Sequence, residues 1–184
     1  EMFRLASCLG MRFIANDPYV DPGLNPDLDV EMVDLDKLFR ESDILCVNCD
    51  LSKKTEKLVG ARLLSLMKPT AFLINTARGP IVVQQDLTKA LQQGKIAGAG
   101  LDVFEKEPPD VDDPLLSMDN VILTPHALAW TDQLFASIGR SVIESVLAVK
   151  RGTIPENAVN RKVLETTRFQ KKMERYQLQS NQIS

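Results

Sequence analysis

The sequence predicts a doubly wound α/β domain built on a parallel sheet. Short apolar runs alternate with helix-like segments, and runs of this length are typical of buried parallel strands. Three of the runs are followed by chemically reactive side chains: Ala71–Asn75 leads to Arg78, Ile96–Leu101 leads to Asp102, and Val121–Leu123 leads to His126, the one histidine of the chain. Because ligands bind beyond the carboxyl ends of parallel strands, this arrangement predicts an active site at that edge.

Turn-forming residues separate the elements expected early in the chain. Met2–Leu9 has helical apolar spacing that Gly10 should end, and Met11–Ala15 should follow as a strand. Residues 21–29 contain Pro22, Gly23 and Pro26 and should form a loop. A short strand is expected near Glu31–Val33.

Further elements follow the same logic. Asp34 should cap a helix over Leu35–Arg40, and the apolar run Asp43–Asn48 should be a strand. A helical region should start at Ser52 or Thr55 and run toward Met67, where Pro69 would stop it.

The second half of the chain carries the clearest helix boundaries. Gln84–Gln93 is amphipathic and ends at Gly94, and Glu107–Pro114 should be an acidic, proline-rich loop. Thr131 should cap a long helix over Asp132–Val149 that Gly152 ends. The polar stretch 165–184 is predicted to be either a loose helix or a disordered tail.

Composition limits the classes of function. The chain has 184 residues, 44% of them hydrophobic, and a net charge of −3 without a basic stripe, so nucleic acid is not the expected partner. No apolar run approaches the roughly 18–20 residues that cross a bilayer, so no membrane association is expected. Three cysteines, an odd and low number, favour a reducing cytoplasm over a disulfide scaffold. The helix-like first residues lack a capping residue, which predicts that the chain enters its domain partway.

For each candidate site residue, the sequence alone allows a functional and a purely structural interpretation. Asp17 ends a predicted strand and could accept hydrogen bonds from an adenosine ribose, or it could simply start a turn before Pro18. Arg78 could hold a carboxylate through its planar guanidinium, or form a surface ion pair. His126 could be a general acid or base whose imidazole Glu107 orients, or a packed histidine.

The motif formed by Cys46 and Cys49 does not predict a metal site. Positions i and i+3 of a strand point to opposite faces, and no second cysteine pair exists. Buried packing is the preferred interpretation of both thiols.

Four ordered segments together resemble the D-isomer-specific 2-hydroxyacid dehydrogenases, of the phosphoglycerate dehydrogenase and hydroxypyruvate reductase type. The segments are Gly10–Tyr19, Leu66–Gly79, Gly98–Pro108 and Asn120–His126. The resemblance covers about residues 1–160. It implies an NAD-dependent oxidoreductase that moves a hydride between NAD(H) and a 2-keto or 2-hydroxy acid, acting as a cytoplasmic homodimer.

The resemblance also implies individual roles. Arg78 is similar to the arginine that binds the substrate carboxylate and carbonyl. His126 is similar to the acid/base residue, and Glu107, rather than Glu105, is similar to the glutamate that pairs with it. Residues expected along NAD are Asp17 and Pro18 at the adenosine ribose, Asp102 at the nicotinamide amide, and Cys49, Thr76, Ala77 and Ala127.

The same resemblance predicts the domain organisation. Residues 1–129 would be the C-terminal part of an NAD-binding domain, 130–162 a long helix and return segment toward a substrate domain, and 163–184 a polar tail. The first strand and glycine-rich phosphate loop of the family are expected to be missing from the sequence. Leu128 and Trp130 follow His126 where the family often has small residues, and Asp50 stands where the family often has proline.

Two other functions remain open from the sequence. Transcriptional corepressors similar to this family use the fold to sense NAD(H), so the chain could be a binding module. It could also be an inactive fragment of the enzyme.

Overall fold

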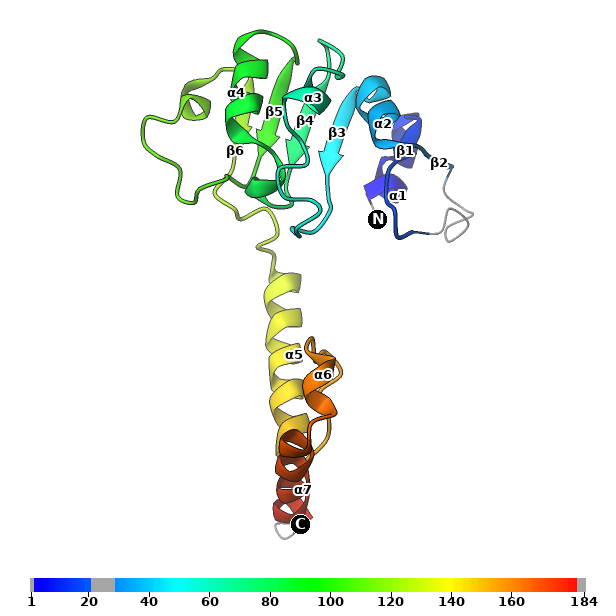
Figure 1. Cartoon of the computed structure of the whole chain (residues 1–184), viewed down its shortest axis with the longest axis vertical. Helices are drawn as coiled ribbons and strands as arrows, with labels where there is room; N and C mark the ends of the chain where they lie inside the picture. Colours follow the sequence, from blue (N-terminus) through cyan, green and yellow to red (C-terminus); the bar gives the residue numbers. More distant parts are fainter. Residues whose placement is uncertain (1, 21–28, 182–184) are drawn as a thin grey trace. The chain divides into compact units, whose positions relative to one another are not determined.

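The computed structural model describes residues 2–20 and 29–181, and the chain divides into two compact units, residues 1–128 and 129–184 (Figure 1). Most of the predicted loop at 21–29, and the last three residues of the tail, lie outside the described residues.

A four-stranded parallel sheet organises the first unit. Its strands are β3 (Ile44–Val47), β4 (Phe72–Asn75), β5 (Gly98–Leu101) and β6 (Val121–Leu123), hydrogen-bonded in the order β3-β4-β5-β6. The register places Leu45 beside Leu73 and Leu73 beside Ala99, so side chains of one face form continuous apolar rows. This confirms the predicted α/β fold with a parallel sheet.

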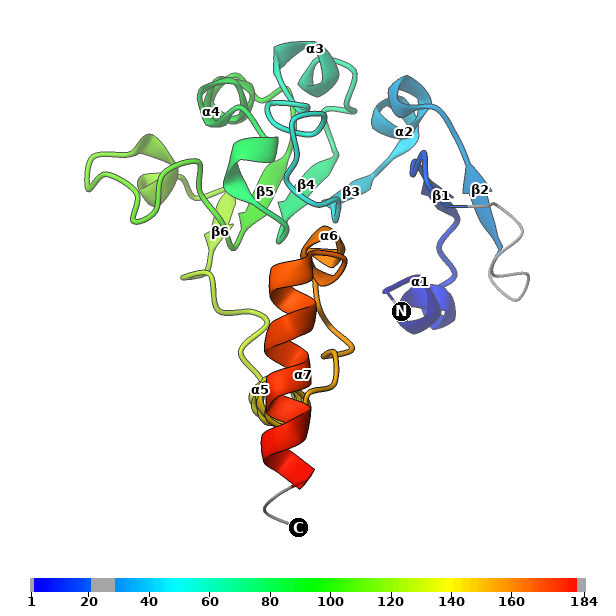
Figure 2. The ribbon, with the colours of Figure 1, turned by 60° about the horizontal axis from the view of Figure 1, so that its bottom comes forward.

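One face of this sheet carries the core. The helices α3 (Ala61–Leu64) and α4 (Gln84–Gln92) lie over it (Figure 2), and Leu73, Leu87 and Leu115 are fully buried there. On the opposite face Phe72 and Ile122 stay 47% and 75% exposed. The expectation that the apolar runs are buried was therefore right for alternate residues only, because no described element of the first unit covers the second face.

A second, two-stranded parallel sheet precedes the first. It pairs β1 (Phe13–Ala15) with β2 (Val30–Met32), after α1 (Met2–Ala6) and a 3-10 turn at Ser7–Leu9. Among the described residues the two sheets are not hydrogen-bonded to each other, so β1 and β3 do not pair.

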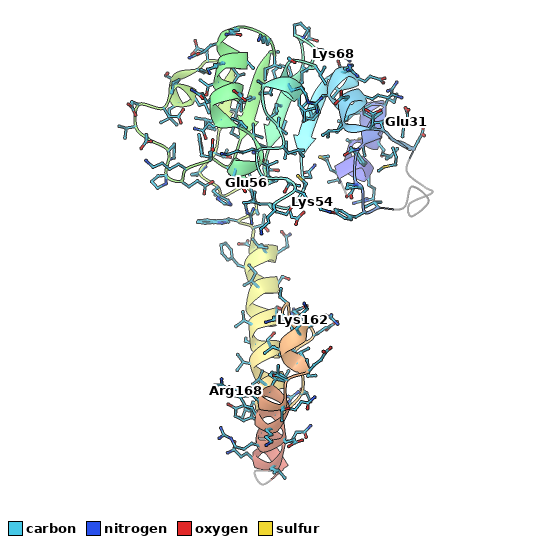
Figure 3. The ribbon with its side chains drawn as sticks, in the orientation of Figure 1. Glu31, Lys54, Glu56, Lys68, Lys162 and Arg168 are labelled. Atoms are coloured by element: carbon cyan, nitrogen blue, oxygen red, sulfur yellow. The ribbon has the colours of Figure 1, made fainter. Side chains whose placement is uncertain are left out.

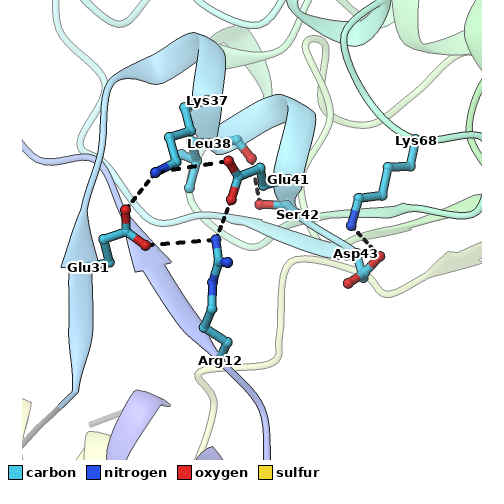
Figure 4. Close-up of polar contacts among 8 residues, drawn as sticks. All are labelled: Arg12, Glu31, Lys37, Leu38, Glu41, Ser42, Asp43 and Lys68. Atoms are coloured by element: carbon cyan, nitrogen blue, oxygen red, sulfur yellow. Dashed lines mark hydrogen bonds and ion pairs between the residues drawn. The ribbon is translucent and has the colours of Figure 1, made fainter.

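Surface ion pairs connect β1 and β2 to the helix α2 (Leu35–Glu41), as Figure 4 shows. Lys37 Nζ lies 2.6 Å from Glu31 Oε1, and the Arg12 guanidinium contacts Glu41 and Glu31. The hydrogen bond from Lys37 lowers the pKa of Glu31. Since these side chains are exposed, the pairs contribute little to stability. As predicted, Asp34 caps α2 by accepting a hydrogen bond from Lys37 N at 2.8 Å.

The predicted helix from Ser52 or Thr55 to Met67 was too long. Residues 53–57 form turns, and only α3 is helical. Lys57 has a left-handed φ of 55°, and Val59 forms a parallel bridge with Val82, donating from its N–H to the Ile81 carbonyl at 3.0 Å. This pairing with a distant segment removes the middle of the predicted helix.

The second unit is helical. It contains α5 (Asp132–Lys150), α6 (Arg161–Leu164) and α7 (Thr167–Asn181). Thr131 caps α5 by accepting from Leu134 N at 3.2 Å, and Gly152 follows the helix with φ 73°, both as predicted. Of the two alternatives for the polar tail, the helix is the one observed over its described part.

Candidate active site

The end of β4 presents Arg78 through a turn that Asn75 shapes. Asn75 is 1% exposed; its Nδ2 donates to the Arg78 carbonyl at 3.1 Å, and its Oδ1 accepts from Ala77 N at 3.1 Å. The side-chain amide of Asn75 thus makes the hydrogen bonds that close the turn, in place of further strand pairing. The exposed side chain of Arg78 projects from this turn. The sequence analysis missed Asn75, although a polar amide closing a buried apolar strand is a usable signal.

Gly79 brings this turn against the segment that follows β5. A Cβ atom at Gly79 would lie 1.8 Å from the Phe104 carbonyl oxygen and 2.5 Å from Glu105 N. Only a residue without a side chain permits this approach. The backbone that carries Arg78 is therefore directly packed on the backbone that leads to Glu107.

Glu107 and His126 form the central contact of the site. Glu107 Oε2 lies 2.8 Å from His126 Nδ1, while Glu107 Oε1 accepts from Phe104 N at 3.0 Å. The hydrogen bond with His126 lowers the pKa of Glu107, as do the Phe104 N–H and, more weakly, the positive charge of Arg78. The carboxylate is therefore ionised near neutral pH. The neighbouring Glu105 instead accepts from Gln84 N at 3.3 Å.

This pairing defines the imidazole chemistry. A carboxylate at Nδ1 favours the tautomer that carries hydrogen on Nδ1, which leaves Nε2 as the second proton site. The His126 and Glu107 side chains are 47% and 39% exposed, so a small molecule can approach them. An oriented imidazole beside a cation is suited to delivering a proton to the oxygen of a bound carbonyl compound.

Asp102 stands between β5 and the segment that carries His126. It is 4% exposed and accepts hydrogen bonds from Thr124 Oγ1 at 2.7 Å, Ala127 N at 3.0 Å and Leu128 N at 3.3 Å. Burial alone would raise the pKa of Asp102, but these hydrogen bonds outweigh it, so the pKa is lowered. The predicted contact of Asp102 with nicotinamide stays a prediction. Thr124 is a second residue that the sequence analysis missed.

Asp17 lies after β1, near the segment that follows β3. Its Oδ1 accepts from Tyr19 N at 2.9 Å, so the turn reading of Asp17 is observed, and its role at a ribose stays a prediction. Lys54 Nζ donates to the Tyr19 hydroxyl at 3.1 Å and joins the two segments. Figure 3 shows Lys54 and Glu56 at the carboxyl-end edge of the sheet, whereas Lys68 lies at the opposite edge.

Cys49 also lies at this edge, beyond the end of β3. It is exposed and Cys46 is half-buried, so the expectation of buried packing was wrong for Cys49, because the strand ends at Val47. Burial raises the pKa of the Cys49 thiol, and the charges of Asp50 and Asp17 raise it further.

The remaining predicted cofactor residues lie after β1, β4 and β6. Thr76 is exposed and Ala77 half-buried in the turn after β4, and Pro18 is exposed beside Asp17. The N–H of Ala127 is bound to Asp102, so any contact of Ala127 with a cofactor would use other atoms. Among the described residues, no group of three or more His, Cys, Asp or Glu side chains could hold a metal ion.

Comparison with known proteins identifies the family. Residues 1–127 match the model of the NAD-binding domain of D-isomer specific 2-hydroxyacid dehydrogenases. The chain belongs to this family. It is 44% identical over 162 residues to a glyoxylate reductase of Korarchaeum cryptofilum, an alignment that covers 88% of the chain and 49% of that protein. It is 39% identical over 161 residues to a D-3-phosphoglycerate dehydrogenase of Methanocaldococcus jannaschii, covering 87% of the chain and 30% of that protein.

Comparison with solved structures supports the same family assignment. The apo structure of D-lactate dehydrogenase from Escherichia coli matches with a TM-score of 0.78 and 32% identity, covering 86% of the chain and 50% of that structure. The NAD-complexed D-isomer specific 2-hydroxyacid dehydrogenase of Lactobacillus delbrueckii ssp. bulgaricus matches with a TM-score of 0.75 and 31% identity, covering 86% of the chain and 51% of that structure. The chain thus spans between 30% and 51% of the length of these relatives.

Proposed function

We propose that the protein carrying this chain is an NAD-dependent D-2-hydroxyacid dehydrogenase that interconverts a 2-keto acid and its 2-hydroxy acid. The observation that carries the proposal is the 2.8 Å contact between Glu107 Oε2 and His126 Nδ1 at the carboxyl end of a parallel sheet. An NAD(H)-sensing module needs no such acid/base pair, so the contact favours an enzyme.

The residues present fit NAD by their chemistry. Asp17 offers an exposed carboxylate at the end of β1, which suits the hydroxyl groups of an adenosine ribose and disfavours the extra phosphate of NADP. The carboxyl end of the sheet, with Thr76, Ala77 and Asp102, is where a dinucleotide binds in open α/β folds. When bound, NADH supplies the hydride, and the protein supplies orientation and charge.

The side chains of this chain account for substrate binding and proton transfer. Arg78 binds the carboxylate of the acid through its two-pronged guanidinium. Protonated His126 donates its proton to the carbonyl oxygen as that oxygen gains negative charge, and Glu107 stabilises the charged imidazole and fixes its orientation. In the direction of oxidation, neutral His126 accepts the hydroxyl proton.

The C-terminal segment supports the proposal of a second domain. We propose that residues 1–129 form the NAD-binding domain, that 130–162 pack against a substrate domain, and that 163–184 form a polar tail. On α5, the side chains of Phe135, Ile138, Val142 and Val146 are 51–61% exposed, an apolar surface suited to such a partner. On α6 and α7, Lys162 and Arg168 are exposed (Figure 3), as are the apolar side chains of Val163 and Leu178.

We further propose a cytoplasmic homodimer. The three cysteines are all free thiols, as a reducing compartment would leave them. No helix of the described residues is long and apolar enough to span a membrane. Sedimentation of the purified full-length protein measures its molecular mass and tests the dimer. A monomeric mass at all protein concentrations would exclude a dimer.

The activity is tested by adding 2-keto acids and NADH to the purified full-length protein that carries this chain and following the loss of NADH absorbance. Glyoxylate, hydroxypyruvate and pyruvate form the panel. The matched variants are His126→Gln, which should abolish reduction, and Glu105→Gln, which should retain it because Glu105 contacts Gln84 rather than His126. No reduction of any acid in the panel, by protein shown to be folded, would contradict the proposal.

A further inference from the structure

The backbone of His126 adopts an unusual conformation. Its φ is 55°, one of two positive values among the described non-glycine residues. Side chains with a Cβ rarely adopt this left-handed region, and they keep it only where the surrounding structure holds them. Neighbouring residues must therefore hold the backbone of His126 in this conformation.

Asp102 contacts the chain on both sides of this strained residue. Before His126, Thr124 Oγ1 donates to Asp102 Oδ1 at 2.7 Å. After it, Ala127 N donates to the same oxygen at 3.0 Å, and Leu128 N donates to Oδ2 at 3.3 Å. Asp102 itself sits directly after β5 and is almost fully buried, so it is a rigid anchor.

We propose that Asp102 is a positioning residue for His126. By holding residues 124–128, which we call the His126 loop, it keeps the imidazole turned so that Nδ1 faces Glu107. The inference rests on the proposed function in taking His126 as the proton donor. It adds to the predicted nicotinamide contact, because Oδ2 accepts one hydrogen bond in the structure and has capacity for another.

Thr124 allows the proposal to be tested without altering the carboxylate. Thr124→Val removes one hydrogen bond at nearly constant volume, and Thr124→Ser restores a hydroxyl as the matched control. Asp102→Asn is the second perturbation. Its amide oxygen can still accept from Thr124 and Ala127, but its NH₂ group would then face the N–H of Leu128, donor against donor.

The imidazole ring of His126 gives the specific readout, and its NMR signals are identified as those that disappear in His126→Gln. The ring signals of His126 in a ¹H–¹⁵N NMR spectrum report whether Nδ1 remains hydrogen-bonded to Glu107. In Thr124→Val and Asp102→Asn we expect the Nδ1 signal to move toward that of a free imidazole, and the amide hydrogens of the His126 loop to exchange faster. For Thr124→Val, kcat should fall about 10- to 100-fold while KM for NADH changes less than about twofold. Thr124→Ser should match the parent.

The outcomes separate this inference from the proposed function. If Thr124→Val and Thr124→Ser share the parent's ring signals and kcat, Asp102 does not position His126 and the inference is overturned. If the parent reduces no 2-keto acid but the ring signals respond as expected, the proposed function fails and the positioning contact stands. Should Asp102→Asn not fold, the Thr124 pair decides alone.

Discussion

Replacing Glu107 by glutamine should move the pH dependence of 2-keto acid reduction without abolishing it. The hydrogen bond with His126 is the main cause of the lowered pKa of Glu107. Across the same 2.8 Å contact, the charge of ionised Glu107 attracts a protonated, positively charged imidazole. Reduction needs that protonated form, so without the carboxylate charge the rate should begin to fail at a lower pH than in the parent.

The strength of the attraction follows from the geometry of the pair. At the 2.8 Å separation of Glu107 Oε2 and His126 Nδ1, two unit charges attract by about 1.5 kcal/mol in bulk water. A dry interior would give a far larger figure, but the two side chains are 47% and 39% exposed, so solvent screening keeps the attraction near the lower limit. Losing this attraction should make the rate begin to fall at a lower pH, and the direction of that change is what the assay tests.

The assay measures kcat/KM for a 2-keto acid with NADH across the pH range. Glu105→Gln is the matched control, since it removes a carboxylate two residues away that accepts from Gln84 N. Its profile should superimpose on that of the parent. A Glu107→Gln profile that also superimposes, or that moves to higher pH, would refute the pairing of Glu107 with His126 in the working enzyme.

Three further predictions concern the substrate, the packing and the cofactor. Arg78→Lys keeps the charge but loses the two-point grip, so kcat/KM should fall about 100-fold or more while NADH binding, measured by calorimetry, persists. Gly79→Ala should cost about 1–3 kcal/mol in denaturant unfolding and lower turnover, because its Cβ would lie 1.8 Å from the Phe104 oxygen. An unchanged midpoint of denaturant unfolding would exclude the packing argument. Asp17→Asn keeps an oxygen that accepts the hydrogen bond of the turn but loses the charge, so the ratio of NADP to NAD activity should rise. An unchanged ratio would exclude a role for Asp17 in cofactor selection and limit it to the turn.

The fold could be predicted from the sequence because its elements depend on local patterns. Short apolar runs, the caps at Asp34 and Thr131 and the stops at Gly94 and Gly152 each act within a few residues. The structure of the segment between Ser52 and Met67 could not be predicted in this way. Its course depends on the pairing of Val59 with Val82, a contact that no local pattern encodes.

The same distinction explains what the sequence could predict about the site. Strand ends placed Arg78, Asp102 and His126 at one edge, because parallel strands all end there. Spacing alone did not separate Glu105 from Glu107, and the family resemblance was needed to choose between them. In the structure Glu107 turns to His126 and Glu105 turns to Gln84.

Two buried polar side chains show what the sequence analysis did not reveal about the site. Asn75, at the end of β4, bonds the turn that carries Arg78, and Asp102, directly after β5, bonds the loop that carries His126. Both are almost fully buried and have all their side-chain polar groups near partners on the adjoining loop. Burying such groups is costly unless they are bonded, so their presence at successive strand ends indicates that they order the loops beyond. The reactive side chains are exposed, so their geometry depends on these buried neighbours. The contacts of the buried residues form only in the folded sheet, which is why the sequence alone did not reveal them.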